Sequence, residues 1–266
     1  MMRNYYLEVA IHAALTAGAV LRDNLSQPHQ LVFKGATDLV TEMDRQAESI
    51  ILTILRDRFP DHGILSEEKG RIKQNREKFL WLIDPLDGTT NYAHGFPWYA
   101  VSIALQEDNT VIAAVVYHPE MEELFSATRG GGAFLNKQKI AVSQQTALGQ
   151  SLLATGFPYN IQQKSEKNIE NFTALLLQSQ GIRRAGAAAL DLCYTACGRF
   201  DGFWEFGLAP WDTAAGSLIL TEAGGTITTF HGKPYSPFNE TVVASNGSIH
   251  QSLLRVLNKF SRSTTK

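Results

Sequence analysis

The sequence has very little cysteine, with only Cys193 and Cys197 among its 266 residues. These two lie four positions apart in a segment expected to be helical, residues 190–198, and the spacing fits neither a disulfide framework nor a zinc site. We therefore expect two small core residues in a reducing compartment. A chain of this kind must be held together by its apolar residues, which make up 44% of the sequence.

Long apolar runs and an excess of basic charge are also lacking. No run approaches the roughly 18 apolar residues of a membrane-spanning helix, and the first residues lack the apolar core and cleavage site of a secretion signal. The formal net charge is −2, which does not predict direct nucleic-acid binding. We expect a cytoplasmic protein with no membrane partner, and the absence of repeats and linkers predicts one domain over residues 1–266.

The most informative segment is residues 79–91. Its apolar beginning predicts a strand buried on both faces, and this strand ends at Asp84 and Asp87. Buried carboxylates are costly without a positive partner, and a divalent cation is the partner that prefers oxygen ligands. Gly88 would let a ligand approach the backbone, and Thr89 adds donors of the kind that hold phosphate.

Two alternatives to a metal site remain for this segment. One is an ordinary polar turn after a strand, since Asp-Gly is a common turn pair. The other is the aspartyl-phosphate phosphatase motif, in which the strand ends in Asp-x-Asp-Gly-Thr. Position 85 is Pro, and the earlier carboxylate is three residues before Asp87. A covalent aspartate nucleophile is therefore disfavoured relative to a metal-activated water.

Acidic residues also follow or begin other predicted elements. A short strand at residues 64–66 ends in Glu67 and Glu68, of which Glu67 is the favoured metal ligand. Asp212 begins a predicted helix that stops at Gly224. Asp212 is thus either the N-cap of that helix or a third source of carboxylate for the same metal cluster.

Thr41 and Asp44 have the spacing of a capping box at the start of a helix that runs to residue 59. Capping explains this pair in part. Asp44, together with Lys34 and Asp38, is also a candidate for a supporting position beside the site.

Together these observations predict a cluster formed by Glu67, Asp84, Asp87 and Asp212. Such acids repel one another and take up protons unless cations neutralise them. A set of oxygen ligands without His or Cys favours Mg²⁺, and two ions about 3.5–4 Å apart would activate a water and clamp the phosphoryl oxygens. We predict hydrolysis of a phosphate monoester without a covalent intermediate, with the water oriented by Thr89 and either Glu67 or Asp44.

The second half of the chain carries weaker signals. The small residues at 185–189 leave room for a ligand or for close helix packing. Arg183 and Arg184 would meet a phosphate or a partner subunit. Glu205, in a predicted strand at residues 200–206, is a buried acid with a partner or a substrate contact.

Two further predictions concern the scaffold. Successive strands at residues 99–106, 111–117 and 123–127, followed by a glycine-rich reversal, predict an antiparallel sheet. Helical spacing over residues 5–25 predicts a packing helix with Leu15 and Leu21 facing inward and Gly18 on the same face.

The chain resembles the inositol monophosphatase family in residues 84–91 (DPLDGTTN), in residues 211–216 (WDTAAG) and in the upstream Glu67-Glu68 pair. The resemblance extends over essentially the whole chain, and residues 201–205 are most similar to bacterial inositol-1-monophosphatases. It implies an α+β fold, an αβαβα layered sandwich. We expect the metal-binding part at about residues 1–145 and the part completing the substrate site at about 146–266.

The resemblance also implies two or three Mg²⁺ ions, lithium inhibition, usually a homodimer, and hydrolysis of inositol 1-phosphate or a related polyol or sugar phosphate. The implied metal ligands are Glu67, Asp84, Asp87, Asp212 and the Leu86 carbonyl. The implied catalytic residues are Glu67, Thr89 and Asp44. The expected substrate contacts are Glu67, Leu86, Asp87, Gly88, Thr89, Arg183, Arg184, Gly186, Ala187, Ala188, Glu205 and Asp212. Ala187 stands where animal members carry a hydroxyl residue, which predicts a less tightly held ring.

Enzymes that resemble this chain but act on other substrates offer alternative predictions of its activity. Related enzymes cleave fructose 1,6-bisphosphate, histidinol phosphate, nucleotide 3′-phosphates or NADP, and residues 183–188 with Glu205 should separate these substrates. Some bacterial relatives are regulatory partners of the transcription machinery. In such a role Arg183 and Arg184 would belong to a dimer or partner surface, but the presence of every expected ligand favours an enzyme.

Overall fold

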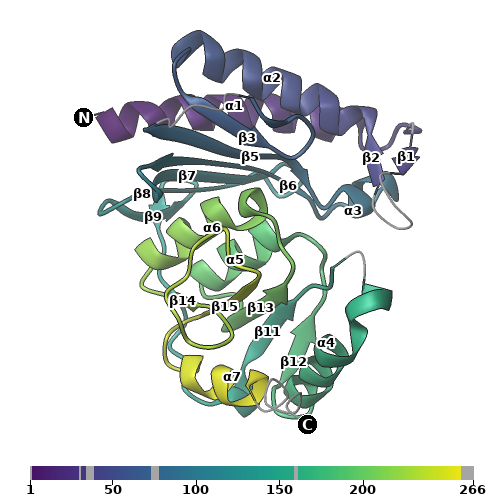
Figure 1. Cartoon of the computed structure of the whole chain (residues 1–266), viewed down its shortest axis with the longest axis vertical. Coiled ribbons are helices and arrows are strands. Elements are labelled where there is room, and N and C mark those ends of the chain that lie inside the picture. Colours follow the sequence, from purple (N-terminus) through teal and green to yellow (C-terminus); the bar gives the residue numbers. More distant parts are fainter. Residues whose placement is uncertain (1, 30, 34–38, 73–77, 159–160, 259–266) are drawn as a thin grey trace.

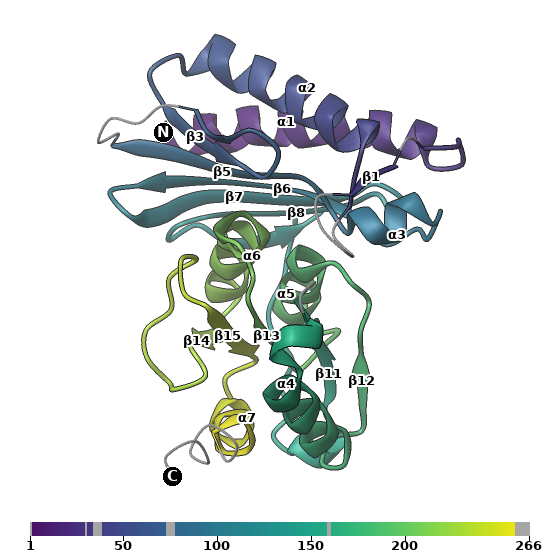
Figure 2. The same cartoon turned by 45° about the vertical axis from the view of Figure 1, so that its right-hand side comes forward.

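The computed structural model describes residues 2–29, 31–33, 39–72, 78–158 and 161–258, and its elements alternate in layers (Figure 1). Helices α1 (Met2–Asn24) and α2 (Glu42–Arg58) cover one face of a large sheet. Helices α5 (Ala188–Ala196) and α6 (Pro210–Glu222) lie between this sheet and a smaller one (Figure 2). Helices α4 (Ile161–Leu176) and α7 (His250–Leu257) lie on the far side of the smaller sheet. The expected α+β layered sandwich, αβαβα, is confirmed.

The large sheet has the strand order β10-β9-β8-β7-β6-β5-β3-β4. The strands are β3 (Gly63–Ser66), β4 (Gly70–Arg71), β5 (Phe79–Asp87), β6 (Ala100–Glu107), β7 (Thr110–His118), β8 (Glu123–Thr128), β9 (Gly132–Leu135) and β10 (Gln138–Lys139). The strands from β5 to β10 are antiparallel, as predicted. Strands β3 and β5 are parallel, with Ser66 opposite Ile83, so the acids that follow both strands leave the sheet at the same edge.

The small sheet has the order β12-β11-β13-β15-β14. Its strands are β11 (Leu152–Thr155), β12 (Gly181–Arg183), β13 (Gly202–Phe206), β14 (Thr226–Thr228) and β15 (Thr241–Ser245). Strands β11, β12 and β13 are parallel, and β13, β15 and β14 are antiparallel. A separate two-stranded sheet joins β1 (Leu31–Phe33) to β2 (Leu39–Thr41), just before α2. The short 3₁₀ helix η1 (Leu148–Gln150) precedes β11.

The inward face of α1 differs from the prediction in one position. Leu21 and Gly18 are buried as expected, but Leu15 is 39% exposed. The buried stripe consists mainly of alanines, including Ala10 and Ala14, because α1 packs close to β7. A Cβ atom at Gly18 would lie 2.5 Å from the Tyr117 ring, so the close approach requires glycine.

Several local predictions are confirmed. Thr41 is the N-cap of α2, and its side chain accepts from the backbone of Met43 and Asp44 in a capping box. Both cysteines are free, with Cys193 buried. Among the described residues, no helix is both long enough and apolar enough to cross a bilayer. The short helix α3 (Thr89–Ala93), which follows β5 directly, was not predicted, and neither were β2, β4, β10, β12 and η1.

Candidate active site

A cavity of about 490 Å³ lies where the large sheet meets the elements around the small sheet. One wall comes from the ends of β3 and β5 and from α3. The opposite wall comes from β13 and from the first turns of α5 and α6. The predicted site residues that line it are Glu67, Asp84, Leu86, Asp87, Gly88, Thr89, Arg184, Gly186, Ala187, Ala188, Glu205 and Asp212. Residues far apart in the sequence thus surround one space.

The first wall holds its acids through the backbone. Asp84 is 2% exposed, and its Oδ1 atom accepts a hydrogen bond from the Leu86 N–H at 3.0 Å. Asp87 Oδ2 accepts from the Ala189 N–H at 2.7 Å, which connects β5 to the start of α5. Glu67 follows β3, and its N–H donates to the Ile83 carbonyl at 3.2 Å. Each acid is therefore fixed relative to β5.

Asp212 comes from the opposite wall. Pro210 begins α6, and Asp212 lies in its first turn with Oδ2 accepting from the Ala209 N–H at 2.7 Å. The N-cap is Ala209, so the alternative in which Asp212 is itself the N-cap is wrong. Its carboxylate reaches back toward the start of the helix, where the helix dipole favours negative charge, and it also lines the cavity.

The acids of the cavity affect one another. Burial raises the pKa of Asp84 well above its usual range, and the charges of Glu67, Asp87 and Asp212 raise it further. Burial, with a smaller contribution from Glu67, raises the pKa of Asp87 to about 7 against the hydrogen bond from Ala189. Burial and the charges of Asp87 and Glu67 also raise the pKa of Asp212. The cluster thus favours protons or cations at neutral pH.

The donor set of this cavity fits a hard divalent cation. The carboxylates of Glu67, Asp84, Asp87 and Asp212 and the Leu86 carbonyl are all oxygen ligands. In the described part of the chain, no three acidic, histidine or cysteine side chains stand close enough together to enclose an ion.

Thr89 connects the cavity to the start of α2. Its hydroxyl lies 2.9 Å from Asp44 Oδ1 and 3.0 Å from the Leu86 carbonyl oxygen, and its single proton can be donated to either. Asp44 is fully buried, and its Oδ2 atom accepts from the Thr41 N–H at 2.8 Å and from the Thr41 hydroxyl at 2.6 Å. Asp44 thus completes the capping box and also holds Thr89, so both roles considered for it are compatible.

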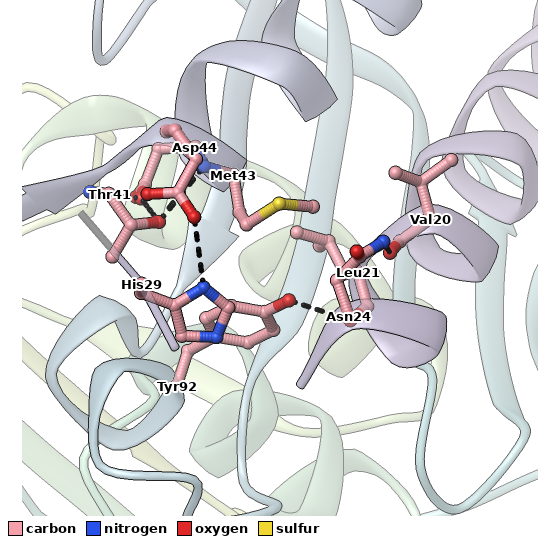
Figure 3. Close-up of polar contacts among 9 residues, drawn as sticks. Val20, Leu21, Asn24, His29, Thr41, Met43, Asp44 and Tyr92 are labelled. Carbon is pink, nitrogen blue, oxygen red and sulfur yellow. Dashed lines mark hydrogen bonds and ion pairs between the residues drawn. The ribbon is translucent and has the colours of Figure 1, made fainter. Parts of the chain in front are cut away.

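The neighbourhood of Asp44 is itself anchored (Figure 3). The ring of His29 lies against that of Tyr92 in α3, with centroids 4.7 Å apart. The Tyr92 hydroxyl donates to the Leu21 carbonyl of α1 at 2.7 Å. His29 Nδ1 lies 3.1 Å from Glu42 Oε1 at the start of α2. These contacts join α1, α2 and α3 behind the cavity.

Gly88 makes the turn between β5 and α3. Its φ is +93°, and a Cβ atom there would lie 2.9 Å from the Trp98 carbonyl oxygen and 3.3 Å from that of Gly186. Only glycine fits this position without strain. The N–H groups at the start of a helix have no partner within it, so the turn presents backbone donors at the cavity edge.

The far end of the cavity is built around Glu205. Burial raises the pKa of Glu205 to about 8, against the opposing charge of Arg184. Gly156 leaves room for this side chain, because a Cβ atom there would lie 2.3 Å from the Glu205 carboxylate oxygens. Gly186, at φ +89°, brings the backbone before α5 close to Arg184.

Some expected site residues lie elsewhere. Arg183, at the end of β12, is exposed and does not line the cavity, and neither does Glu68. Lys34 and Asp38 lie outside the described residues.

Several residues of the cavity wall were not predicted as site residues, among them Asn91 and Asp191. Asn91 Nδ2 donates to the carbonyls of Trp98 at 2.8 Å and Ala185 at 2.9 Å, and so connects α3 to the segment before α5. Asp191 is 1% exposed and lines the cavity from α5. An acid within an otherwise apolar helix was the available signal for Asp191, and Asn91 is the last residue of the DPLDGTTN motif at residues 84–91.

Comparisons with known proteins agree with this geometry. The sequence profile of the inositol monophosphatase family matches residues 2–262. An inositol-1-monophosphatase of Synechocystis sp. is 47% identical over 95% of this chain and 88% of its own length. A protein named Nus factor SuhB from Pseudomonas aeruginosa is 44% identical over 94% of this chain and 95% of its own. The solved inositol monophosphatase of Anabaena (Nostoc) sp. superposes with a TM-score of 0.89 at 41% identity, over 97% of each chain.

Proposed function

The chain belongs to the inositol monophosphatase family, a family of phosphatases, and we propose that it hydrolyses inositol 1-phosphate to inositol and phosphate with Mg²⁺ as cofactor. The observation that carries the proposal is the cavity itself, which is lined by acids from both walls and by the turn at Gly88. Related polyol and sugar phosphates form the wider substrate class that this cavity would accept.

Glu67, Asp84, Asp87, Asp212 and the Leu86 carbonyl would hold the Mg²⁺ ions. The ions would supply Lewis-acid stabilisation of the phosphoryl oxygens and lower the pKa of a water. Their charge would also offset the repulsion that raises the pKa of Asp84. The donor set is consistent with two or three ions and with inhibition by lithium.

The chain's own residues would orient the reaction. Glu67 and the Thr89 hydroxyl hold the attacking water by hydrogen bonds, and Asp44 fixes the Thr89 hydroxyl at 2.9 Å. The water oxygen forms a bond to phosphorus while the ester P–O bond breaks. One water proton ends on the departing alcohol, so free inositol and inorganic phosphate leave without a covalent enzyme intermediate.

The two ends of the cavity would bind different parts of the ester. Backbone N–H groups at Gly88 and Thr89 hold the phosphate oxygens, as preorganised donors do in other phosphoryl sites. Glu205, Asp212 and the small residues at 186–188 contact the alcohol ring. Arg184 borders the same end and offsets part of its negative charge.

The test is phosphate release from inositol 1-phosphate as the Mg²⁺ concentration is varied. We expect release that depends on Mg²⁺ and is lost in Asp87→Asn, because this carboxylate is central to the cluster. Asp201→Asn is the matched control, since Asp201 is also buried but lies outside the cavity. Absence of release by the wild-type protein at any Mg²⁺ concentration would refute the proposal.

A parallel panel decides the substrate. It contains fructose 1,6-bisphosphate, histidinol phosphate, a nucleotide 3′-phosphate and NADP. We expect inositol 1-phosphate to have the highest kcat/KM. A higher kcat/KM for another ester would support phosphatase activity but show that inositol 1-phosphate is not the preferred substrate.

A second candidate function is regulatory. A relative named Nus factor SuhB is 44% identical to this chain, and Arg183 is exposed and outside the cavity. We propose that Arg183 belongs to a surface for a second copy of the chain or for a partner in the transcription machinery. Sedimentation of wild type and Arg183→Ala would measure the dimer, with the exposed Arg255→Ala as control. Retention of purified RNA polymerase by the wild type and by both variants would measure partner binding. No retention by the wild type would count against this role.

A further inference from the structure

Asp191 is a buried acid that the proposed reaction does not use. It is 1% exposed, it lies in the first half of α5, and it lines the cavity. Among the described residues, no hydrogen-bond donor reaches its Oδ1 atom. A buried carboxylate oxygen without a donor is unfavourable, so such an atom in a folded protein requires an explanation.

The backbone of Asp191 does not share this isolation. Its N–H donates to the Ala187 carbonyl at 3.0 Å, and its carbonyl accepts from the Thr195 hydroxyl at 2.8 Å. Both bonds belong to the helix. The unsatisfied group is therefore the side chain alone, and it projects from a helix whose other residues are apolar or small, apart from Tyr194 and Thr195.

Two other buried acids accept hydrogen bonds on both carboxylate oxygens. Asp201 accepts from the Ser143 hydroxyl at 2.5 Å and from the Leu152 N–H at 2.7 Å. Glu123 accepts from the Tyr194 hydroxyl at 2.7 Å and forms an ion pair with Arg199. These two acids do not line the cavity. Glu48 Oε2, also outside the cavity, accepts no hydrogen bond among the described residues but lies 3.8 Å from Lys69 Nζ. Asp191 instead lines the cavity, so a ligand there can supply its donor.

Asp191 lies near Glu205 at the far end of the cavity. Burial and then the charge of Glu205 are the largest causes of a raised pKa at Asp191, and Arg184 opposes them. Helix α5 packs against β13, which carries Glu205. An unpaired carboxyl oxygen at this end of the cavity needs a hydrogen-bond donor, and neither a phosphate dianion nor a carboxylate supplies one. A hydroxyl group is the donor that fits.

We propose that Asp191 is a specificity-determining residue whose carboxylate accepts a hydrogen bond from a ring hydroxyl of a polyol monophosphate, beside the hydroxyl bound by Glu205. The inference rests on the proposed function, because it requires the phosphate at Gly88 and Thr89. A site built to bind a hydroxyl rejects analogues that lack it, since its buried acceptor then stays unpaired. Asp191 would thus select hydroxyl-rich alcohols over apolar ones.

The experiment compares inositol 1-phosphate with cyclohexyl phosphate, which has the ring and the phosphate but no hydroxyl groups. In Asp191→Asn, which keeps the side-chain volume, kcat/KM for inositol 1-phosphate should fall about 10- to 100-fold, the loss expected when a buried hydrogen bond loses one of its partners. The fall should appear mainly in KM. The value for cyclohexyl phosphate should change less than about twofold, within the uncertainty of such comparisons.

Asp201→Asn is the matched control, because Asp201 is a buried acid that already has its donors. It should affect both esters equally. An equal loss for both esters in Asp191→Asn, or no loss for either, would overturn the inference while leaving the phosphatase in place. Failure of the wild-type protein to hydrolyse either ester would overturn the proposed function, and this inference with it.

Thermal unfolding without substrate separates this role from a structural one. Because no donor in the described part of the chain reaches Asp191 Oδ1, Asp191→Asn should have an unchanged or higher Tm. Free inositol should raise the Tm of the wild type and have less effect on the variant. A lower Tm for Asp191→Asn would show that the carboxylate holds the fold together, and would contradict the inference.

Discussion

At the scale of single residues, the hydroxyl of Thr89 is where the capping box and the cavity meet. It lies within hydrogen-bond distance of both Asp44 and the Leu86 carbonyl. We predict that Thr89→Val, which removes the hydroxyl at nearly constant volume, lowers kcat about 100-fold or more with a smaller change in KM. Thr89→Ser keeps the hydroxyl and should retain most activity. Steady-state phosphate release measures both, and equal loss in the two variants would argue against the role of the hydroxyl.

The raised pKa values of the cavity acids predict a coupling between protons and metal. Carboxyl groups that hold protons near pH 7 must release them when a cation binds. We expect Mg²⁺ binding at pH 6.5 to release protons, and Asp84→Asn to release fewer. Calorimetric titration in two buffers that differ in ionisation enthalpy measures the number of protons released on Mg²⁺ binding. Binding heats that are independent of the buffer would contradict this prediction.

The same groups fix the sign of the pH dependence of stability. Asp87 has a folded-state pKa of about 7 against 3.8 for the free side chain, so the folded state binds more protons than the unfolded state between these values. The free energy of unfolding of the metal-free protein should therefore fall as the pH rises through this window. Mg²⁺ should stabilise the protein more at pH 7.5 than at pH 5.

At the scale of elements, the packing of α1 on β7 depends on a missing side chain. A Cβ atom at Gly18 would lie 2.5 Å from Tyr117 Cδ1, and overpacking of this kind costs about 1–3 kcal/mol. We predict that Gly18→Ala lowers the free energy of unfolding by about 1 kcal/mol or more, although alanine favours helix. Leu15→Gln on the exposed side of the same helix should change it by less than about 0.5 kcal/mol. Urea denaturation measures both, and a stabilised Gly18→Ala would show that Tyr117 moves freely.

The elements could be predicted from the sequence where composition and period agree. The apolar run before Asp84 predicted β5, and the Thr41–Asp44 spacing predicted the start of α2. The inward face of α1 was misjudged at Leu15, because alanines, which are poor markers of burial, form the contact stripe. Helix α3 has only five residues, too few to show a helical period.

The site was predictable only in part, because some of its contacts join segments that are far apart in the sequence. Acids at strand ends identified Glu67 and Asp87, because parallel strands bring such ends to one edge. The hydrogen bonds of Asn91 join segments about ninety residues apart, and no local pattern predicts such a contact. Asp212 was predicted as a helix start, but its backward bond to Ala209 depends on the turn geometry.

At the scale of the whole molecule, the two parts of the chain are joined through the cavity. Asp87 binds the Ala189 N–H, and Asn91 binds the Ala185 carbonyl. Helix α6 also packs directly against the large sheet. We therefore predict one cooperative unfolding transition for the chain, with neither residues 1–145 nor residues 146–266 folding alone.

Two tryptophans make this prediction testable. Trp81 in β5 and Trp204 in β13 are both buried, one in each part. Variants that keep only one of them, with the other tryptophans changed to phenylalanine, should show the same urea midpoint by fluorescence and by circular dichroism. Midpoints that differ between the two variants would indicate two independent domains.

Because distant segments form the two walls of the cavity, the cavity cannot be completed until late in translation. The ribosome releases β5 and Asp87 well before α6 and Asp212, because synthesis proceeds from the N-terminus. Until α6 has emerged, a nascent chain has only one of the two walls. Chains truncated by a premature stop codon before α6 would therefore lack the complete cavity, and faulty translation would not yield an unregulated fragment with the same chemistry.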